Sequence, residues 1–203
     1  MRGDGVLTTL GGAPKLTTIL QAAVRRLQLQ LAMVVATVLM FAATLAINDW
    51  LFSKLEFAAG INWIYLPAGV RLLATLLFAE AGALGLLLVS WPVDFIWFFP
   101  DDPARAFIGG IISTVAPYGV YLAARRVYGL QASLVNLTPR RLLVLAVAYA
   151  IAGPLLHHVY FAWRGQPDLV RGFIAMATGD LAGTLLVLYA VRAVLRVASP
   201  RQG

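Results

Sequence analysis

From Leu29 to Asn48 the chain runs without a single charged residue. A helix needs roughly 20 mainly apolar residues to cross the hydrocarbon core of a bilayer, and this stretch has that length. Inside lipid, only helices and closed barrels satisfy all their backbone hydrogen bonds. The whole chain is 61% hydrophobic and 12% charged, whereas soluble domains carry roughly 25% charged residues. The sequence therefore predicts a polytopic membrane protein of the all-α class.

Six segments are apolar enough to cross the membrane, so we expect a bundle of six transmembrane helices. They are Leu29–Asn48, Asn62–Ala79, Gly82–Phe99, Ala106–Ala124, Arg141–Trp163 and Arg171–Arg192. The expected organisation is a cytoplasmic N-terminal segment at 1–28 with a short amphipathic helix, a transmembrane domain at 29–192, and a cytoplasmic tail at 193–203. Most loops are too short to hold a soluble catalytic or output module, so function is expected within the bundle or through a partner.

Orientation follows from the cations, because cytoplasmic loops carry an excess of Lys and Arg. With both termini inside, the cytoplasmic side holds eleven cations, namely Arg2, Lys15, Arg25, Arg26, Arg125, Arg126, Arg140, Arg141, Arg192, Arg196 and Arg201. The outer side holds four, namely Lys54, Arg105, Arg164 and Arg171. The Arg-rich, Ala-rich and Leu-rich composition indicates a GC-rich bacterial genome, so the expected location is the bacterial inner membrane. The net charge of +7 is spread over short loops and does not predict a nucleic-acid partner.

Ionisable residues inside spans are the first candidates for a site, since each costs ~2.5–3.5 kcal/mol on insertion scales. Arg71 and Asp180 lie mid-depth in the second and sixth spans, and Asp94 lies in the outer half of the third. Two interpretations stay open. Arg71 and Asp180 neutralise each other in a structural ion pair, or they flank a polar cavity in which Arg71 takes a carboxylate or phosphate and Asp94 or Asp180 takes an amine.

Helix breakers beside these charges favour the cavity interpretation. Asn62, Trp63, Pro67 and Gly69 precede Arg71, and we expect Pro67 to open the backbone of the second span. Lipid tolerates such a defect only where protein or a water-lined cavity satisfies the freed groups. Further prolines stand inside the third, fourth and fifth spans, at positions 92, 117 and 154.

His157 and His158 lie in the outer half of the fifth span and are adjacent. On a helix they point about 100° apart and cannot share one metal ion. We expect a hydrogen-bonded or pH-sensing role for them, and predict no cofactor and no metal. The chain has no Cys, no Gly-x-Ser-x-Gly, no P-loop and no His-Glu-x-x-His, so it is not expected to be an enzyme.

Gly179 and Gly183 form a small-xxx-small step around Asp180. Such steps let a neighbouring helix approach closely, within one chain or between two chains. We favour packing within the chain, with a helix covering Asp180.

Two motifs, Trp63-x-x-x-Pro67-x-Gly69 and Gly179-Asp180-x-x-Gly183, resemble the bacterial membrane-associated sensor domain of the first type. The resemblance implies a ligand role for Trp63, Pro67, Gly69 and Asp180. Members usually continue into a cytoplasmic signalling module, and we expect a separate partner to take that role here. In size and span count the chain is also similar to the substrate-binding subunits of energy-coupling-factor transporters, which bind a ligand from outside and dock on a partner.

The expected function is therefore an inner-membrane sensory or ligand-binding protein with a polar cavity on its outer side. Its partners would be membrane lipid, a small polar solute, and a protein that docks on the loop Arg125–Arg141 or on small-residue helix faces. The alternatives are a structural or assembly subunit of a larger membrane complex and a substrate-binding subunit of a small-solute transporter.

Overall fold

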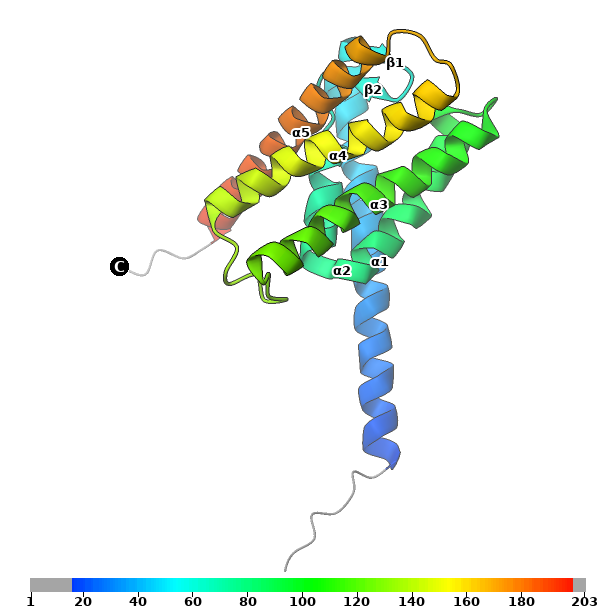
Figure 1. Cartoon of the computed structure of the whole chain (residues 1–203). Helices are drawn as coiled ribbons and strands as arrows, with labels where there is room; N and C mark the ends of the chain where they lie inside the picture. Colours follow the sequence, from blue (N-terminus) through cyan, green and yellow to red (C-terminus); the bar gives the residue numbers. More distant parts are fainter. Residues whose placement is uncertain (1–15, 199–203) are drawn as a thin grey trace, which may run out of the picture.

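The computed structural model describes residues 16–198, so the expected segment at 1–28 and tail at 193–203 fall partly outside the described residues. The chain is all-α and contains α1 (Leu16–Phe52), α2 (Pro67–Val93), α3 (Pro103–Tyr128), α4 (Pro139–Trp163) and α5 (Leu169–Ala198) (Figure 1). A 3-10 turn, η1 (Ser53–Leu55), and a two-stranded antiparallel hairpin, β1 (Glu56–Ala58) and β2 (Ile61–Asn62), join α1 to α2. A π-helix, η2 (Asp94–Phe98), continues α2.

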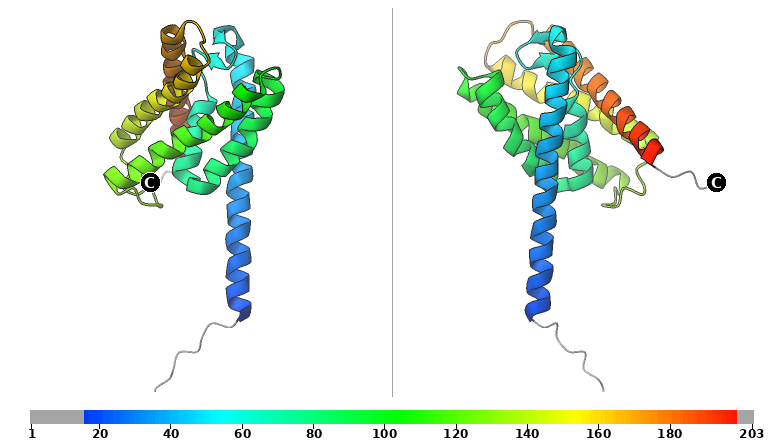
Figure 2. Two further views of the ribbon diagram at one scale, coloured as in Figure 1. Left: turned by 45° about the vertical axis from the view of Figure 1, so that its right-hand side comes forward. Right: turned by 180° about the vertical axis from the view of Figure 1, so that it is seen from behind.

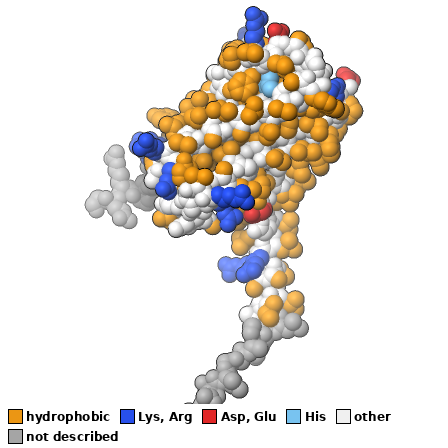
Figure 3. Space-filling view, viewed as in Figure 1, with side chains coloured by type: hydrophobic (Ala, Val, Ile, Leu, Met, Phe, Trp, Pro, Cys, Tyr) orange, Lys and Arg blue, Asp and Glu red, His pale blue; other side chains and the backbone are white. Residues whose placement is uncertain are grey.

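Five helices of the described chain are long and apolar enough to cross a membrane. We expected six separate spans, but the second and third expected spans are joined in α2. The expected short amphipathic helix is also not separate, because α1 is one continuous helix of 37 residues. Hydrophobic side chains cover most of the face shown in Figure 3, as lipid contact requires.

The helix α2 is not straight. Ala79 has non-helical angles, φ 49° and ψ −119°, and the chain reverses there. A Cβ at Gly82 would overlap the backbone carbonyl of Ala74, and Val70 shares one core cluster with Val89. The two limbs of α2 therefore pack against each other, as Figure 1 shows beside α1.

Helix α1 packs on α2, whereas its N-terminal part extends beyond the other helices in every view (Figures 1 and 2). The close contact is made at Gly85, where a Cβ would stand 2.7 Å from the Cβ of Thr37. Phe41 is fully buried in this interface. The C-terminal part of α1 is thus the part that the fold holds in place.

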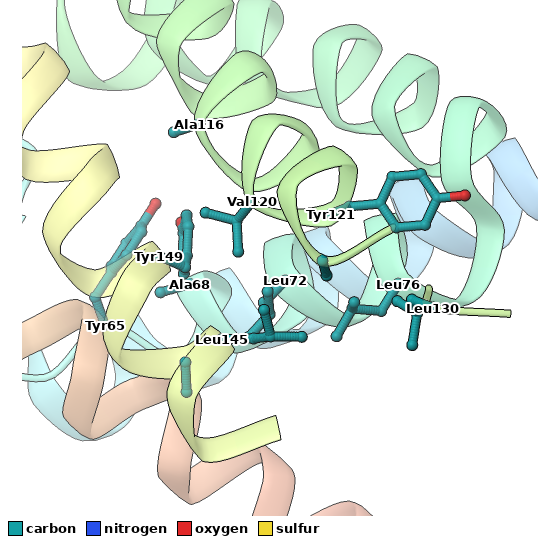
Figure 4. Packing of buried hydrophobic residues seen from close by; sticks show 12 residues of the cluster. Tyr65, Ala68, Leu72, Leu76, Ala116, Val120, Tyr121, Leu130, Leu145 and Tyr149 are labelled. Carbon is teal, nitrogen blue, oxygen red and sulfur yellow. The ribbon is translucent and has the colours of Figure 1, made fainter. Parts of the chain in front are cut away.

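The main core lies between α2, α3 and α4. It runs from Tyr65 and Tyr149 at one end to Leu76, Tyr121 and Leu130 at the other (Figure 4). Tyr149 is the largest fully buried side chain of the described residues. The two tyrosines bring hydroxyl groups to the end of this core that faces the buried charges described next.

We expected a neighbouring helix to pack against Gly179 and Gly183. In the structure an extended segment of the same chain packs there instead. A Cβ at Gly179 would overlap the carbonyl of Asn62, and one at Gly183 would overlap the carbonyl of Tyr65. The Tyr65 amide donates a hydrogen bond to the Gly179 carbonyl, at 3.1 Å. This contact fixes the chain between β2 and α2 on the surface of α5.

Candidate functional site

A small polar cavity of about 30 Å³ lies beneath the hairpin. Four ionisable side chains line it from four elements: Arg71 on α2, Asp94 on η2, Arg105 on α3 and His157 on α4. Tyr65, Ser113 and Tyr160 add hydroxyl groups to its wall. Since one water molecule needs roughly 10–15 Å³ by this measure, the cavity holds about two waters or a group of similar size.

Arg71 is 6% exposed and projects from the first limb of α2. Its guanidinium carbon lies 5.3 Å from the ring centroids of both Phe41 and Tyr65. These rings stabilise the buried cation through their π faces. The Nε atom of Arg71 is buried and has no hydrogen-bond partner.

Arg71 forms no direct ion pair with either buried carboxylate. Within residues 16–198 a single ion pair lies inside 4.0 Å, and it joins Arg164 to Asp102 on the surface. Arg71 therefore stands between rings, with Asp94 and Asp180 at longer range. A buried guanidinium with no carboxylate inside 4.0 Å and a free Nε still carries a desolvation cost, so waters or a ligand would stabilise this arrangement further.

Asp94 lies where the α-helix changes to a π-helix. Pro92 has no N–H to donate, and the next turns widen into the π-helix η2, in which the Phe99 amide donates to the Asp94 carbonyl at 2.8 Å. Such π-turns occur frequently at functional sites. The carboxylate is buried, and its Oδ2 atom has no hydrogen-bond partner.

Arg105 was not predicted as a site residue. It precedes the fourth expected span, so we expected it in an outer loop. In the structure it lies between two aromatic rings, 4.1 Å from the centroid of Phe99 and 4.9 Å from that of Phe161. Its Nη2 donates to the Ala59 carbonyl at 3.2 Å, and its Nε is buried without a partner. The signal in the sequence is Asp102-Pro103, a helix start that places position 105 in the first turn of α3 and not in a loop.

Asp180 is 2% exposed and does not line the cavity. It lies near α4, where a Cβ at Gly153 would stand 3.4 Å from its Oδ2 and 3.7 Å from the ring of Tyr149. Asp180 thus belongs to the layer behind the cavity wall, together with Tyr149.

The two histidines face different spaces, as their adjacent positions predicted. His157 lines the polar cavity. His158 lies against Gly172 in a second depression of about 110 Å³, which Arg105 also lines. The Nδ1 atom of His158 is 2.8 Å from the Pro154 carbonyl, and a carbonyl only accepts, so Nδ1 carries the proton. Among residues 16–198, no group of three or more His, Asp and Glu side chains is placed to hold a metal ion.

The remaining predicted site residues do not line the polar cavity. Pro67 is the first residue of α2, not a break within it, so it frees no carbonyl inside the helix. Gly69 lets α2 approach α5, where a Cβ would stand 2.6 Å from the Cβ of Val187. Trp63 is half exposed and packs edge-on against Phe57.

Asn62 lines a larger cavity of about 600 Å³, which lies between α1, the hairpin and η2. Tyr65, Phe98 and Ala59 line both this cavity and the polar one. These three residues are therefore the wall between the two spaces.

No family model matches the chain, no curated protein matches its sequence, and no solved structure matches its fold. The likeness to the sensor domain and to the energy-coupling-factor subunits stays a prediction.

Proposed function

We propose that this chain is a sensory or ligand-binding membrane protein whose polar cavity takes a small polar solute. One observation carries the proposal: Arg71 Nε, Arg105 Nε and Asp94 Oδ2 are all buried without hydrogen-bond partners, and their side chains line one cavity. Buried polar groups in proteins nearly always have hydrogen-bond partners, so three such groups around one space are suited to bind a polar occupant. Ordered water is the plainest occupant, and a solute that replaces it would use the same groups.

The chemistry of these groups defines the solute. The two guanidinium groups donate hydrogen bonds to an anionic oxygen, such as that of a carboxylate or phosphate. The Asp94 carboxylate accepts from an amine or hydroxyl. With about 30 Å³ available, only the polar end of a solute fits, and a larger one requires movement of Tyr65 or Phe98, which separate the cavity from the larger space.

For the topology we propose six passes with both termini inside, in a bacterial inner membrane. The reversal at Ala79 supports one crossing from Asn62 to Ala79 and a second from Gly82 to Phe99. The excess of cations at the opposite end from the hairpin supports the orientation. Because the chain has no Cys, single-Cys variants test this directly. Ser53→Cys should react with an impermeant maleimide in intact cells, whereas Ala79→Cys and Ser133→Cys should react only after permeabilisation.

As a sensor, the chain would act through a partner that docks on Arg125–Arg141 or on small-residue helix faces. A ligand that bridges α2, η2 and α3 would change the packing at the π-helix. One feature favours the alternative of an assembly subunit: the N-terminal part of α1 extends beyond the bundle, where its side chains Leu20, Val24 and Leu27 are exposed and could contact another protein. A transport role would require uptake into vesicles that contain this chain.

Native mass spectrometry of the protein, extracted gently from its own membrane, tests the proposal. The wild type should carry a small bound mass that is lost in Arg71→Ala and kept in Arg164→Ala, which removes an Arg outside the cavity. A co-purifying protein with no small molecule, unchanged by Arg71→Ala, would favour the assembly subunit.

A further inference from the structure

The larger cavity, of about 600 Å³, has a different character from the polar one. Its deeper wall is apolar and is made by Ala42, Leu45 and Ala46 of α1 with Val93 and Phe98 on the opposite side. Its volume lies within the roughly 300–1,000 Å³ of ordinary ligand pockets. An alkyl chain is the group that such a wall accommodates.

The surface around this cavity is one that contacts lipid. Ile47 and Leu51 on α1 are 45% and 52% exposed, and Ile96 on η2 is 76% exposed. Trp50 and Trp97, which line the cavity, are 81% and 68% exposed. Exposed tryptophans gather at the level of the lipid headgroups, so the cavity opens from the membrane at that level.

The rim of the cavity is acidic. Asp49 and Glu56 are the ionisable carboxylates that line it, and the lining residues, all within the described chain, include no Lys, Arg or His. Both are exposed, and the Oε1 of Glu56 accepts a hydrogen bond of 3.3 Å from the Gly60 amide. An acidic rim above an apolar wall complements a cationic headgroup above an alkyl chain.

We infer that this cavity holds one acyl chain of a lipid of the surrounding membrane, with the amine of its headgroup at Asp49 and Glu56. The site does not depend on the solute site, since its polar groups are different. It shares only Ala59, Tyr65 and Phe98 with the polar cavity.

The test uses the full chain, reconstituted in vesicles of equal phosphatidylethanolamine and phosphatidylglycerol and then extracted for native mass spectrometry. The wild type should retain one phosphatidylethanolamine in several-fold preference over phosphatidylglycerol. Ala46→Trp, which fills the cavity, should lose it. Leu39→Trp, on the exposed face of the same helix and outside the cavity, should keep it.

A second variant leaves the apolar wall of the cavity unchanged. It tests the lipid site even if Ala46→Trp fails to fold. The double variant Asp49→Asn, Glu56→Gln should lower the preference for phosphatidylethanolamine about fivefold, as expected for exposed charge pairs. Equal retention of the two lipids by the wild type would overturn the inference. An unchanged retained lipid in a folded Ala46→Trp, or an unchanged preference in the double variant, would also overturn it.

Discussion

The carboxylate of Asp94 on η2 lies directly against Gly109 on α3, where a Cβ would stand 3.0 Å from Oδ2. Gly109→Ala therefore forces the carboxylate to shift by a few tenths of an ångström. We expect the affinity for the solute to fall by about three- to tenfold, since small misplacements of a binding group weaken it. Titration of purified Gly109→Ala with the solute found by native mass spectrometry checks this prediction.

Gly119 supplies the matched control on the same helix. No heavy atom lies within 4 Å of a Cβ built there, so Gly119→Ala should leave the affinity unchanged. It should raise the free energy of unfolding by ~0.5–1 kcal/mol through helix propensity. Equal loss of affinity in both variants would show that Asp94 does not contact the solute.

A double-mutant cycle of Arg71→Ala and Asp180→Asn distinguishes a ligand site from a structural ion pair. Removing one partner of a direct buried ion pair lowers the free energy of unfolding by ~3–5 kcal/mol, and removing the second partner as well restores stability. Since Arg71 contacts the Phe41 and Tyr65 rings and forms no ion pair with Asp180, we expect a coupling energy of about 1 kcal/mol or less. Unfolding of the four proteins in SDS measures it.

A large coupling energy, with Arg71→Ala misfolded and the double variant restored, would support the structural interpretation. The measurement also separates two causes of lost solute binding. If Arg71→Ala retains the wild-type unfolding transition and loses the solute, Arg71 contacts the solute directly.

The all-α membrane class could be predicted from the sequence because lipid accepts few other structures. The boundary expected between the second and third spans, near Ala79 and Gly82, coincides with the reversal of α2. The backbone conformation at this reversal could not be predicted, because Ala79 carries no sign of its positive φ. An Ala in this conformation depends on packing by its neighbours.

The candidate site could be predicted in part. Insertion cost alone selected Arg71, Asp94 and His157, which the structure brings to one cavity. It did not find Arg105, since a charge near a helix start also fits a loop. The expectation that Pro67 opens the backbone inside the second span was wrong, because a proline has a different effect at a helix start and inside a helix, and α2 begins at Pro67.

Gly183→Ala tests how far the segment before α2 depends on α5. A Cβ at position 183 would overlap the carbonyl of Tyr65, and the backbone has little freedom to move because Tyr65 is also bonded to Gly179. We expect the variant to lower the free energy of unfolding by about 1–3 kcal/mol. The SDS transition of Gly183→Ala, compared with that of Gly119→Ala, measures the loss. A Gly183→Ala protein as stable as Gly119→Ala would contradict this packing.

Asp102 has two roles that substitution separates. It caps α3 by accepting from the Arg105 amide at 3.0 Å, and it pairs with Arg164 at 3.1 Å. Asp102→Asn keeps a good cap and loses the charge, so we expect a loss of ~0–1 kcal/mol in unfolding free energy, as Arg164→Gln should also give. Asp102→Ala loses the cap as well and should cost a further ~0.5–2 kcal/mol.

Salt distinguishes the two contributions of Asp102. Because both side chains of the ion pair are about one third exposed, added NaCl should shrink the effect of Asp102→Asn and leave the extra effect of Asp102→Ala unchanged. The cap also sets the first turn of α3, which positions Arg105 between the rings of Phe99 and Phe161. Asp102→Ala should therefore weaken solute binding more than Asp102→Asn does. An Asn variant that binds as poorly as the Ala variant would mean that the ion pair, and not the cap, positions Arg105.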